Sequence, residues 1–287
     1  MAFKDARGQR GLYLATVAAA QPISPHYVRV TLRGDDLRRL PRRGYDHWFR
    51  LFLPRGPDEP DFAALPAQFG MSGYLKFKTS GLSGKVAVRN YTVREHRPEA
   101  GEIDVDFVMH GGDHGAVPQD AEASAAPAGI AASWARRAQP GDPVALIDQG
   151  CGFSPGPEAG LYVLAGDESA QPAILGILRD LPPTARGLAL IEVPEPADAQ
   201  EAQPPAGFDL RWIFRSESPN APARAPNPTP GAAALAALRE YQPDRPGDVT
   251  AYVCGESALA AEGRRHLVAA GVPKANIQFT GYWRARA

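Results

Sequence analysis

The sequence predicts two domains of different fold class: a small N-terminal antiparallel β-barrel, and after it an α/β domain with a mainly parallel sheet. Three observations lead to this prediction. The first half holds short, roughly alternating segments rich in β-branched residues and separated by turn residues. After residue 158, continuous apolar runs alternate with segments of helical spacing. The chain has 287 residues, more than one hydrophobic core commonly organises, so we expect domains at residues 1–156 and 157–287.

Short strands separated by turns account for most of the first domain. The segment Tyr27–Gly34 shows the pattern, with rough alternation and a Gly-Asp-Asp turn at its end. Several such strands in succession are typical of an antiparallel barrel. The expected strands are Tyr27–Gly34, His47–Pro54, Gly73–Lys78, Val86–Glu95, Glu102–His110 and Asp142–Asp148. A single helix is expected among them, at Ser133–Ala138.

The second domain alternates strands with helices. Gly160–Asp167 is a continuous apolar run, which is typical of a strand buried on both faces of a parallel sheet. The next segment has helical spacing and carries Pro172 near its start, where proline is tolerated. The expected strands are Gly160–Asp167, Gly187–Pro194, Phe208–Phe214, Val249–Glu256 and Ile277–Trp283, and the expected helices are Gln171–Leu181, Ala233–Tyr241 and Ala258–Gly271.

Composition excludes several functional classes. The formal net charge is −1, which argues against non-specific nucleic-acid binding, because that requires a basic face. The two cysteines, Cys151 and Cys254, are too far apart for a zinc motif, and they fit a reducing compartment. No leader peptide and no membrane-spanning apolar run is visible. We therefore expect a cytoplasmic monomer without membrane insertion. Proline-rich tracts at 111–129 and within 193–231 are expected to form loops.

One strand, "VAVRNYTVREH", combines residue types that suit a flat, phosphate-bearing cofactor. The guanidinium of Arg89 offers a planar fork for phosphate oxygens. The ring of Tyr91 can lie flat on a heterocycle, and the hydroxyl of Thr92 can bond a ring nitrogen. A flavin dinucleotide is the natural candidate. The alternative is an ordinary amphipathic strand whose arginines are solvated.

Six motifs in order resemble the siderophore-interacting protein family, which are flavin-dependent ferric-siderophore reductases related to the ferredoxin-NADP reductases. They are "RNYTVR", "IDVDFVMHG", "SWARRAQPGD", "YVLAGDESAQPAI", "YVCGESALAAEGRRHL" and "FTGYWR". The match runs from about Tyr27 to Arg284. The resemblance implies an FAD-binding barrel, an NAD(P)H-binding α/β domain, and reduction of ferric iron in a siderophore complex that releases ferrous iron in the cytosol.

The resemblance also assigns residues to the FAD site. Arg89 would pair with the pyrophosphate, Tyr91 would stack on the isoalloxazine, and Thr92 would bond near its reactive nitrogen. Asn90 would complete this strand. The next strand and the start of the barrel helix would supply the remaining contacts, from Asp106, Val108, His110, Ala131, Ala132, Ser133 and Trp134. A helix start is a natural anion site. Relatives commonly have Gly-Pro-Ala-Ser before this tryptophan, whereas this chain reads "GIAASW". Packing in the core is the alternative role for Trp134.

The nicotinamide cofactor would lie at the ends of two strands of the second domain. The resemblance assigns it to Gly166, Asp167, Glu168, Ser169, Gly255 and Glu256. Ligands of open α/β sheets bind outside the carboxyl ends of strands. No G-x-G-x-x-G fingerprint follows either strand, so an ordinary Rossmann dehydrogenase is excluded. The alternative is a pair of capped helix starts. NADPH and NADH are both open as donors, and a ferredoxin is a further alternative; arginines at 211, 215, 264 and 265 are candidates for a 2′-phosphate.

Basic and aromatic groups are candidates for binding the anionic ferric siderophore. The residues named are Lys76, Lys78, Trp283 and Arg284. Three other functions compete. A hydrolase would use "CGESAL" as a nucleophile elbow, but Leu259 stands where that turn needs glycine. A metal site would use His110 and His114, which lie among glycines rather than on a helix. A siderophore carrier without redox activity would have no use for the Arg-Asn-Tyr-Thr strand.

Overall fold

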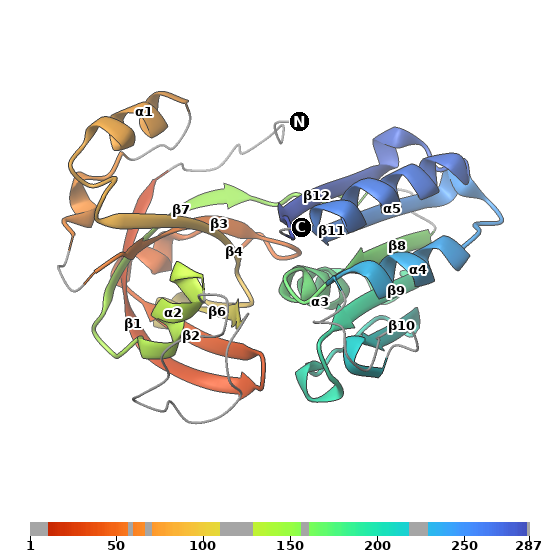
Figure 1. The fold of residues 1–287 in the computed structure, drawn as a ribbon, viewed down its shortest axis with the longest axis horizontal. Helices are drawn as coiled ribbons and strands as arrows, with labels where there is room; N and C mark the ends of the chain where they lie inside the picture. The colour runs from red at the N-terminus through yellow and green to blue at the C-terminus, as the bar shows by residue number, and fades with distance from the viewer. Residues whose placement is uncertain are drawn as a thin grey trace. The chain divides into compact units, whose positions relative to one another are not determined.

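The computed structural model describes residues 11–56, 60–66, 71–109, 129–155, 161–217 and 229–285. These residues form two compact units (Figure 1). The first unit comprises Met1–Arg43 and His47–Gly150, and the second comprises Gly44–Asp46 and Cys151–Ala287. Within the described ranges, no helix has both the length and the apolar character needed to cross a membrane.

The first unit is an antiparallel sheet of seven strands. Its strands are β1 (Leu12–Ser24), β2 (Tyr27–Arg33), β3 (Trp48–Pro54), β4 (Val86–Thr92), β5 (Glu95–Arg97), β6 (Glu102–Val108) and β7 (Pro143–Gly150). They pair in the order β4-β3-β7-β1-β2-β6-β5. This confirms the predicted antiparallel, barrel-like domain. Among the described residues the hydrogen-bonded ladder leaves the barrel open between its end strands, β4 and β5.

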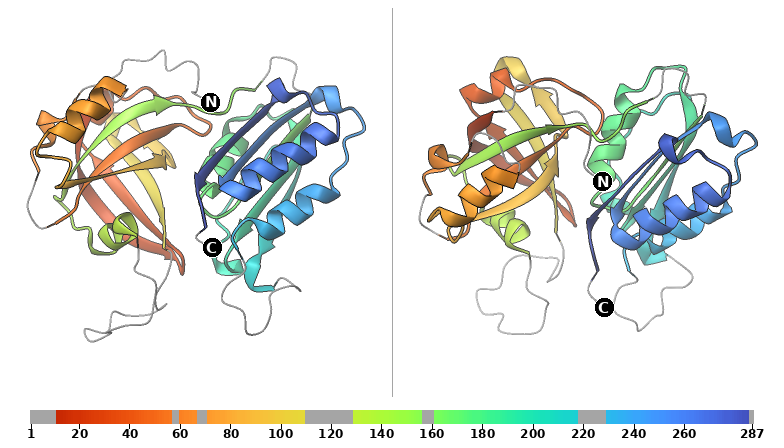
Figure 2. Two further views of the ribbon diagram at one scale, coloured as in Figure 1. Left: turned by 45° about the horizontal axis from the view of Figure 1, so that its top comes forward. Right: turned by 90° about the horizontal axis from the view of Figure 1, so that it is seen from above.

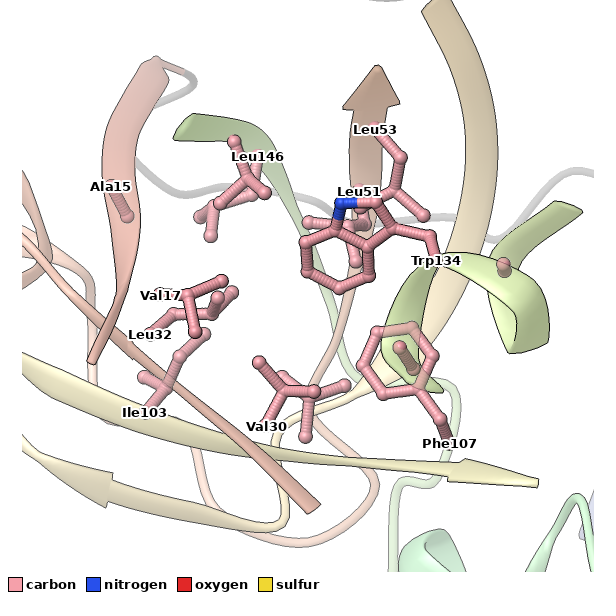
Figure 3. Close-up of a cluster of buried hydrophobic side chains, with 14 of the residues drawn as sticks. Ala15, Val17, Val30, Leu32, Leu51, Leu53, Ile103, Phe107, Trp134 and Leu146 are labelled. Atoms are coloured by element: carbon pink, nitrogen blue, oxygen red, sulfur yellow. The ribbon is translucent and has the colours of Figure 1, made fainter. Parts of the chain in front are cut away.

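Helix α2 (Ile130–Arg137) contacts both β4 and β6 and covers the core of the first unit. Figure 3 shows the indole of Trp134 and the ring of Phe107 reaching into this core, with Leu51 and Leu53 of β3 close by. The centroids of the Trp134 and Phe107 rings are 5.6 Å apart. Trp134 is 2% exposed, so its side chain serves packing, as the alternative interpretation of the sequence held.

The expected strand at Gly73–Lys78 was wrong, because this segment lies within helix α1 (Met71–Thr79). Alternation of apolar and polar residues suggested a strand, in which Leu75 and Phe77 would share a face. In a helix, residues two apart point in nearly opposite directions. Phe77 is accordingly buried against Phe52, whereas Leu75 is 64% exposed.

The second unit contains a five-stranded parallel sheet in the order β10-β9-β8-β11-β12. The strands are β8 (Leu161–Gly166), β9 (Arg186–Val193), β10 (Gly207–Phe214), β11 (Val249–Glu256) and β12 (Ile277–Trp283). The helices are α3 (Gln171–Asp180), α4 (Ala232–Glu240) and α5 (Ser257–Ala269). Each lies within a residue or two of the predicted segments, and the parallel α/β class is confirmed.

Residue parity decides which helix covers which face of the parallel sheet. Leu164 of β8 packs with α3, whereas its neighbours Val163 and Ala165 pack with α4 and α5. Figure 2 shows α4 and α5 side by side on the same face. All eight positions of β11 are buried, as expected for a strand covered on both faces. Short 3₁₀ turns connect these elements at Asp35–Arg39, Phe62–Ala64, Pro98–Ala100, Pro196–Asp198, Arg215–Glu217, Pro246–Asp248 and Lys274–Asn276.

Chain order places a topological switch point between β8 and β11. From β8 the chain moves outward through β9 and β10, and it then returns to pair β11 on the other side of β8. Open α/β sheets bind ligands outside the carboxyl ends of strands at such a point. The carboxyl ends of β8 and β11 are therefore the expected ligand position in the second unit.

Segment Gly44–Asp46 is attached to the second unit through a buried carboxylate. Asp46 accepts hydrogen bonds from the backbone N–H groups of Gly152 and Phe153 at 3.0–3.1 Å and from the Tyr252 hydroxyl at 3.0 Å. Burial raises the pKa of this carboxyl, and the bonds it accepts partly offset that effect. A charged group within this segment thus fixes it to the second unit, through partners that lie more than 100 residues away in sequence.

Candidate cofactor sites

Arg89 and Tyr91 share one face of β4, because side chains two apart on a strand point the same way. The guanidinium of Arg89 is exposed, and its Nη1 donates to the carbonyl of the adjacent Val88 at 2.8 Å. Among the described residues no carboxylate pairs with it. Arginines elsewhere on this sheet do have carboxylate partners, such as Arg29 with Asp106. Arg89 is therefore a cation available to an external anion.

Tyr91 is supported from below by the core. The centroid of its ring lies 4.2 Å from that of Phe107, with the planes tilted by 41°. Phe107 in turn packs on Trp134 of α2. Burial raises the pKa of the Tyr91 phenol, so the ring stays neutral at physiological pH. An aromatic platform of this kind, held two residues from a free guanidinium, suits a planar ring that carries phosphate.

The other two residues of the Arg-Asn-Tyr-Thr run lie on the opposite face of the strand. Asn90 stands across from Arg50 of β3, and Thr92 stands across from Trp48. The alternation of side chains along a strand separates this pair from Arg89 and Tyr91. Asn90 is exposed and Thr92 half-buried. The structure thus brings together two of the four residues on one face.

The start of α2 is capped by Gly129, which provides no side-chain hydrogen bond to the helix. Ala131 and Ala132 are 6% and 7% exposed, so their methyl groups serve the core. Ser133 is half-buried, and its backbone N–H donates to the Gly129 carbonyl at 2.9 Å. A contact of Ala131 or Ala132 with an anion would therefore use backbone groups.

Asp106 is buried and already paired. Both of its oxygens accept from Arg29, at 2.7 and 2.9 Å, and Arg94 lies 3.8 Å away. The hydrogen bond to Asp106 raises the pKa of Arg29. This carboxylate fastens β2 to β6. Val108 lies half-buried at the end of β6, and His110 falls outside the described residues, as does the alternative metal pair of His110 and His114.

In the second unit, Asp167 joins the ends of β8 and β11. It is fully buried and accepts hydrogen bonds from the N–H and the hydroxyl of Ser169, at 2.9 and 2.6 Å, and from the N–H of Glu256 at 2.6 Å. Burial, and next the nearby charge of Glu168, raise the pKa of this carboxyl to about 6 despite these bonds.

Gly255 makes this junction sterically possible. Its φ is +125°, and a Cβ added there would lie 2.7 Å from the Asp167 carboxyl carbon. Only glycine tolerates both conditions. Gly255, Glu256 and Asp167, all predicted from the resemblance to bind the nicotinamide cofactor, lie together at the switch point.

Glu168 is bonded to Arg215, one of the four arginines that were candidates for binding a 2′-phosphate. Arg215 donates to both oxygens of Glu168, at 2.9 and 3.0 Å, and to Glu192 at 2.8 Å. Burial disfavours the charged form of Arg215, but the two carboxylates outweigh it and raise its pKa. Glu192 also accepts from the backbone at Gly231, Ala233 and Ala234, all at 2.9 Å. Arg215 is thus a structural bridge rather than an open phosphate ligand.

The last described residues cross the carboxyl ends of the same strands. The Trp283 indole N–H donates to Oδ2 of Asp167 at 3.1 Å, and the Ala285 N–H donates to Oε1 of Glu256 at 3.2 Å. The Ser257 hydroxyl donates to the Trp283 carbonyl at 2.7 Å. This serine therefore holds the end of β12 in place rather than forming part of a hydrolase triad. Glu256 also caps α5 by accepting from Ala258. Arg284, which follows Trp283, is exposed.

The remaining candidate residues, for binding the siderophore or a 2′-phosphate, lie on several different elements. Lys76 and Lys78 are exposed on α1 of the first unit, and their helical spacing turns them to different faces. Trp283 and Arg284 belong to the second unit. The guanidinium of Arg264 lies over the Phe279 ring, 4.7 Å from its centroid. Arg211 pairs with Asp209 at 2.5 Å.

Sequence reasoning missed Glu192 and Gln171. Glu192 is a charged residue inside an apolar strand, and this was the available signal. Gln171 opens α3 and is fully buried, and neither polar atom of its amide has a hydrogen-bond partner among the described residues. The available signal was its position two residues after the predicted cofactor-binding residues at 166–169.

The residues of the first unit fit FAD. A dinucleotide with a planar ring can use three features found here. They are an exposed guanidinium without a carboxylate partner among the described residues, an aromatic ring supported by the core, and a helix start without a side-chain cap. In the second unit the predicted carboxylates are already bonded internally. A pyridine nucleotide there would meet backbone groups and the buried amide of Gln171.

Two family models match the chain. The siderophore-interacting FAD-binding domain matches residues 16–151, and the siderophore-interacting protein domain matches residues 159–286. An uncharacterized protein of Mycobacterium tuberculosis is 32% identical over 281 residues, covering 96% of this chain and 91% of that protein. The ferric vibriobactin reductase ViuB of Vibrio cholerae is 29% identical over 250 residues, covering 85% of this chain and 79% of that protein.

Solved structures resemble this fold over nearly the whole chain. A siderophore utilization protein from T. fusca has a TM-score of 0.69 at 28% identity, covering 96% of this chain and 94% of that one. The ferredoxin reductase of carbazole 1,9a-dioxygenase has a TM-score of 0.58 at 16% identity, covering 95% of this chain and 69% of that one. The second likeness shows a ferredoxin-reductase-like fold.

Proposed function

Because this chain belongs to the siderophore-interacting protein family, we propose that it is an FAD-dependent oxidoreductase that reduces ferric iron in a siderophore complex. The electrons would come from NADPH or NADH, and the ferrous iron would be released in the cytosol. The V. cholerae relative is named a ferric vibriobactin reductase, and this supports the proposed reaction class. Ferrous iron binds hard oxygen donors less tightly than ferric iron, so reduction weakens the chelate.

The observation that carries the proposal is the pair Arg89 and Tyr91. Arg89 is an exposed cation without a carboxylate partner among the described residues, and Tyr91 presents a ring that Phe107 supports. A siderophore carrier without a redox cofactor has no need for this combination. The pairing of a phosphate-binding guanidinium with an aromatic platform favours a flavin dinucleotide.

Bound FAD would supply the redox chemistry, accepting two electrons from a donor and passing them singly to iron. The chain's own residues bind and orient. Arg89 neutralises phosphate charge, and the backbone at the start of α2 offers N–H donors. The packed rings of Tyr91, Phe107 and Trp134 would support the planar ring of the cofactor. Lys76 and Lys78 of the first unit, and separately Arg284 of the second, are exposed cations and each is a candidate for attracting an anionic ferric chelate.

A ferredoxin is a second candidate donor, and one observation favours it. Trp283 and Ala285 already bond Asp167 and Glu256, the carboxylates predicted to meet a pyridine nucleotide. A nucleotide that binds those carboxylates must displace residues 283–285 from them, whereas a protein donor need not enter this position. Reduction of the bound flavin by NADH, NADPH and a reduced ferredoxin, compared at equal driving force, distinguishes the donors.

Flavin retention tests the proposal. Arg89→Ala removes a charge-assisted contact, so we expect FAD affinity to fall about 10- to 100-fold, the equivalent of roughly 1.5–3 kcal/mol. Arg39→Ala, an exposed arginine of the same unit, is the matched control and should bind FAD like the parent protein. A purified protein that is colourless and binds no added FAD would overturn the proposal and leave a siderophore carrier.

A further inference from the structure

Gln171 is a fully buried side chain whose amide oxygen and nitrogen both lack hydrogen-bond partners among the described residues. It is the first residue of α3, and its backbone N–H donates to the Asp167 carbonyl at 3.1 Å. It therefore stands at the carboxyl end of β8, beside the switch point. The NH₂ group of this side chain can donate and its oxygen can accept, so the amide can bond both a carbonyl and an N–H on the edge of one ligand.

The neighbours of Gln171 along the helix do not satisfy it. Ala170, Pro172, Ala173 and Ile174 are all buried and apolar. Buried polar side-chain atoms are nearly always bonded, and an unbonded one costs free energy. A leucine would fill a similar volume without that cost. An amide retained under these conditions indicates a group that becomes bonded when something else is present.

We infer that the side-chain amide of Gln171 binds the planar edge of a ligand that presents a carbonyl next to an N–H. This rests on the proposed function, because the carboxamide of a nicotinamide nucleotide has that edge. The Gln171 nitrogen would donate to the ligand carbonyl, and the Gln171 oxygen would accept from the ligand N–H, forming a two-bond amide pair.

Gln171→Leu separates ligand binding from a purely structural role of the amide. Binding is measured by equilibrium fluorescence titration of the full-length protein with NADH, with 3-acetylpyridine adenine dinucleotide, and with FAD. The acetylpyridine analogue keeps the carbonyl and replaces the amide nitrogen with a methyl group. Unfolding by urea is followed in parallel without added nucleotide. Gln242→Leu, an exposed glutamine of the same unit, is the control.

We expect Gln171→Leu to weaken NADH binding about tenfold while the acetylpyridine analogue loses distinctly less, because the lost acceptor matters only to a ligand that donates. The urea midpoint should stay the same or rise, because a buried unbonded amide has been removed. FAD affinity should stay the same, because the residues proposed to hold FAD belong to the first unit and Gln171 belongs to the second. The control should change neither binding nor the midpoint.

Unchanged affinity of Gln171→Leu for NADH and for the analogue would overturn the inference, and a lower urea midpoint beside it would show an internal structural role. Failure of the proposed nicotinamide donor looks different. In that case the parent protein retains flavin but binds neither NADH nor NADPH, and the amide inference fails with the donor.

Discussion

The indole nitrogen of Trp283 lies 3.1 Å from Oδ2 of Asp167 and donates a hydrogen bond to it. This bond connects the end of β12 to the loop after β8, across β11. Asp167 is fully buried and also accepts from Ser169 and Glu256. The polar junction at the switch point therefore depends on one carboxylate and three neighbouring segments.

Asp167 should make stability depend on pH in the direction opposite to most carboxylates. Its pKa is about 6 in the folded protein against an ordinary 3.8. The folded state thus binds the proton more tightly, and stability is lost as pH rises between these values, by up to about 3 kcal/mol. Asp167→Asn should therefore gain stability relative to the parent as pH rises from 4 to 7, measured by urea unfolding.

Asp148→Asn provides the contrast for that series. The pKa of Asp148 is lowered to about 2, because hydrogen bonds from His47 and Arg43 outweigh its burial. Its contribution is present above 3.8 and is lost as pH falls toward 2, so the Asp148→Asn difference should be flat between pH 4 and 7. A flat Asp167→Asn difference over the same range would contradict the assigned pKa.

Trp283→Phe should weaken the junction without removing the aromatic ring. The variant loses one N–H donor to a carboxylate, which stabilises by about 1.5–3 kcal/mol. Asp167 then titrates at a higher pH, because fewer bonds favour its charged form. Urea unfolding at pH 5 and 7 measures both effects. Trp212→Phe, a half-buried tryptophan of β10, is the matched control. Equal behaviour of the two variants would argue against the bond.

Arg215→Met should be severely destabilising, because it leaves Glu168 and Glu192 buried without their cation. Removing one partner of a buried ion pair costs about 3–5 kcal/mol. Combining it with Glu168→Gln should recover part of the loss, since one uncompensated charge disappears. Arg211→Ala, which breaks an exposed pair, should change stability little. The test compares the free energy of unfolding of the parent, of Arg215→Met, of Glu168→Gln and of the double variant, and additive losses in the double variant would contradict the coupling.

Gly255→Ala should disrupt the contact between β11 and Asp167. The residue has a φ of +125°, and the new Cβ would meet the carboxyl at 2.7 Å. Strain of this kind costs about 1–3 kcal/mol before the clash is added. Gly247→Ala meets nothing within 4 Å and is the control. Thermal unfolding of the two variants side by side decides, and similar midpoints would show that the close approach is not required.

Strong local patterns made most of the fold predictable. The buried strands of the second unit are continuous apolar runs, and β8 and β11 appear within a residue of their expected bounds. Strand β1 was missed because Leu12–Ser24 is rich in alanine and contains Pro22, both depleted in strands. The structure places Pro22 next to a register irregularity with β2, where proline is tolerated.

The site was predictable where residues lie close in sequence and not where they meet through folding. Arg89 and Tyr91 are two apart, and Asp167 follows a recognisable strand. The bridge from Arg215 to Glu168 and Glu192 joins residues 47 and 23 positions apart, which no local pattern reveals. The strand assignment around Lys76 failed because short alternation does not distinguish a strand from a helix that buries Phe77 and exposes Leu75.

The most direct test of the central claim is a single anaerobic turnover. The flavin-loaded protein is reduced, freed of excess reductant and mixed with a ferric siderophore and a chelator specific for ferrous iron. We predict that oxidised-flavin absorbance returns as ferrous chelate forms, with about two irons reduced per flavin because each iron takes one electron. Arg89→Ala should yield iron only in proportion to the flavin it retains. A flavin that stays reduced until air is admitted, with no ferrous chelate, would contradict the account.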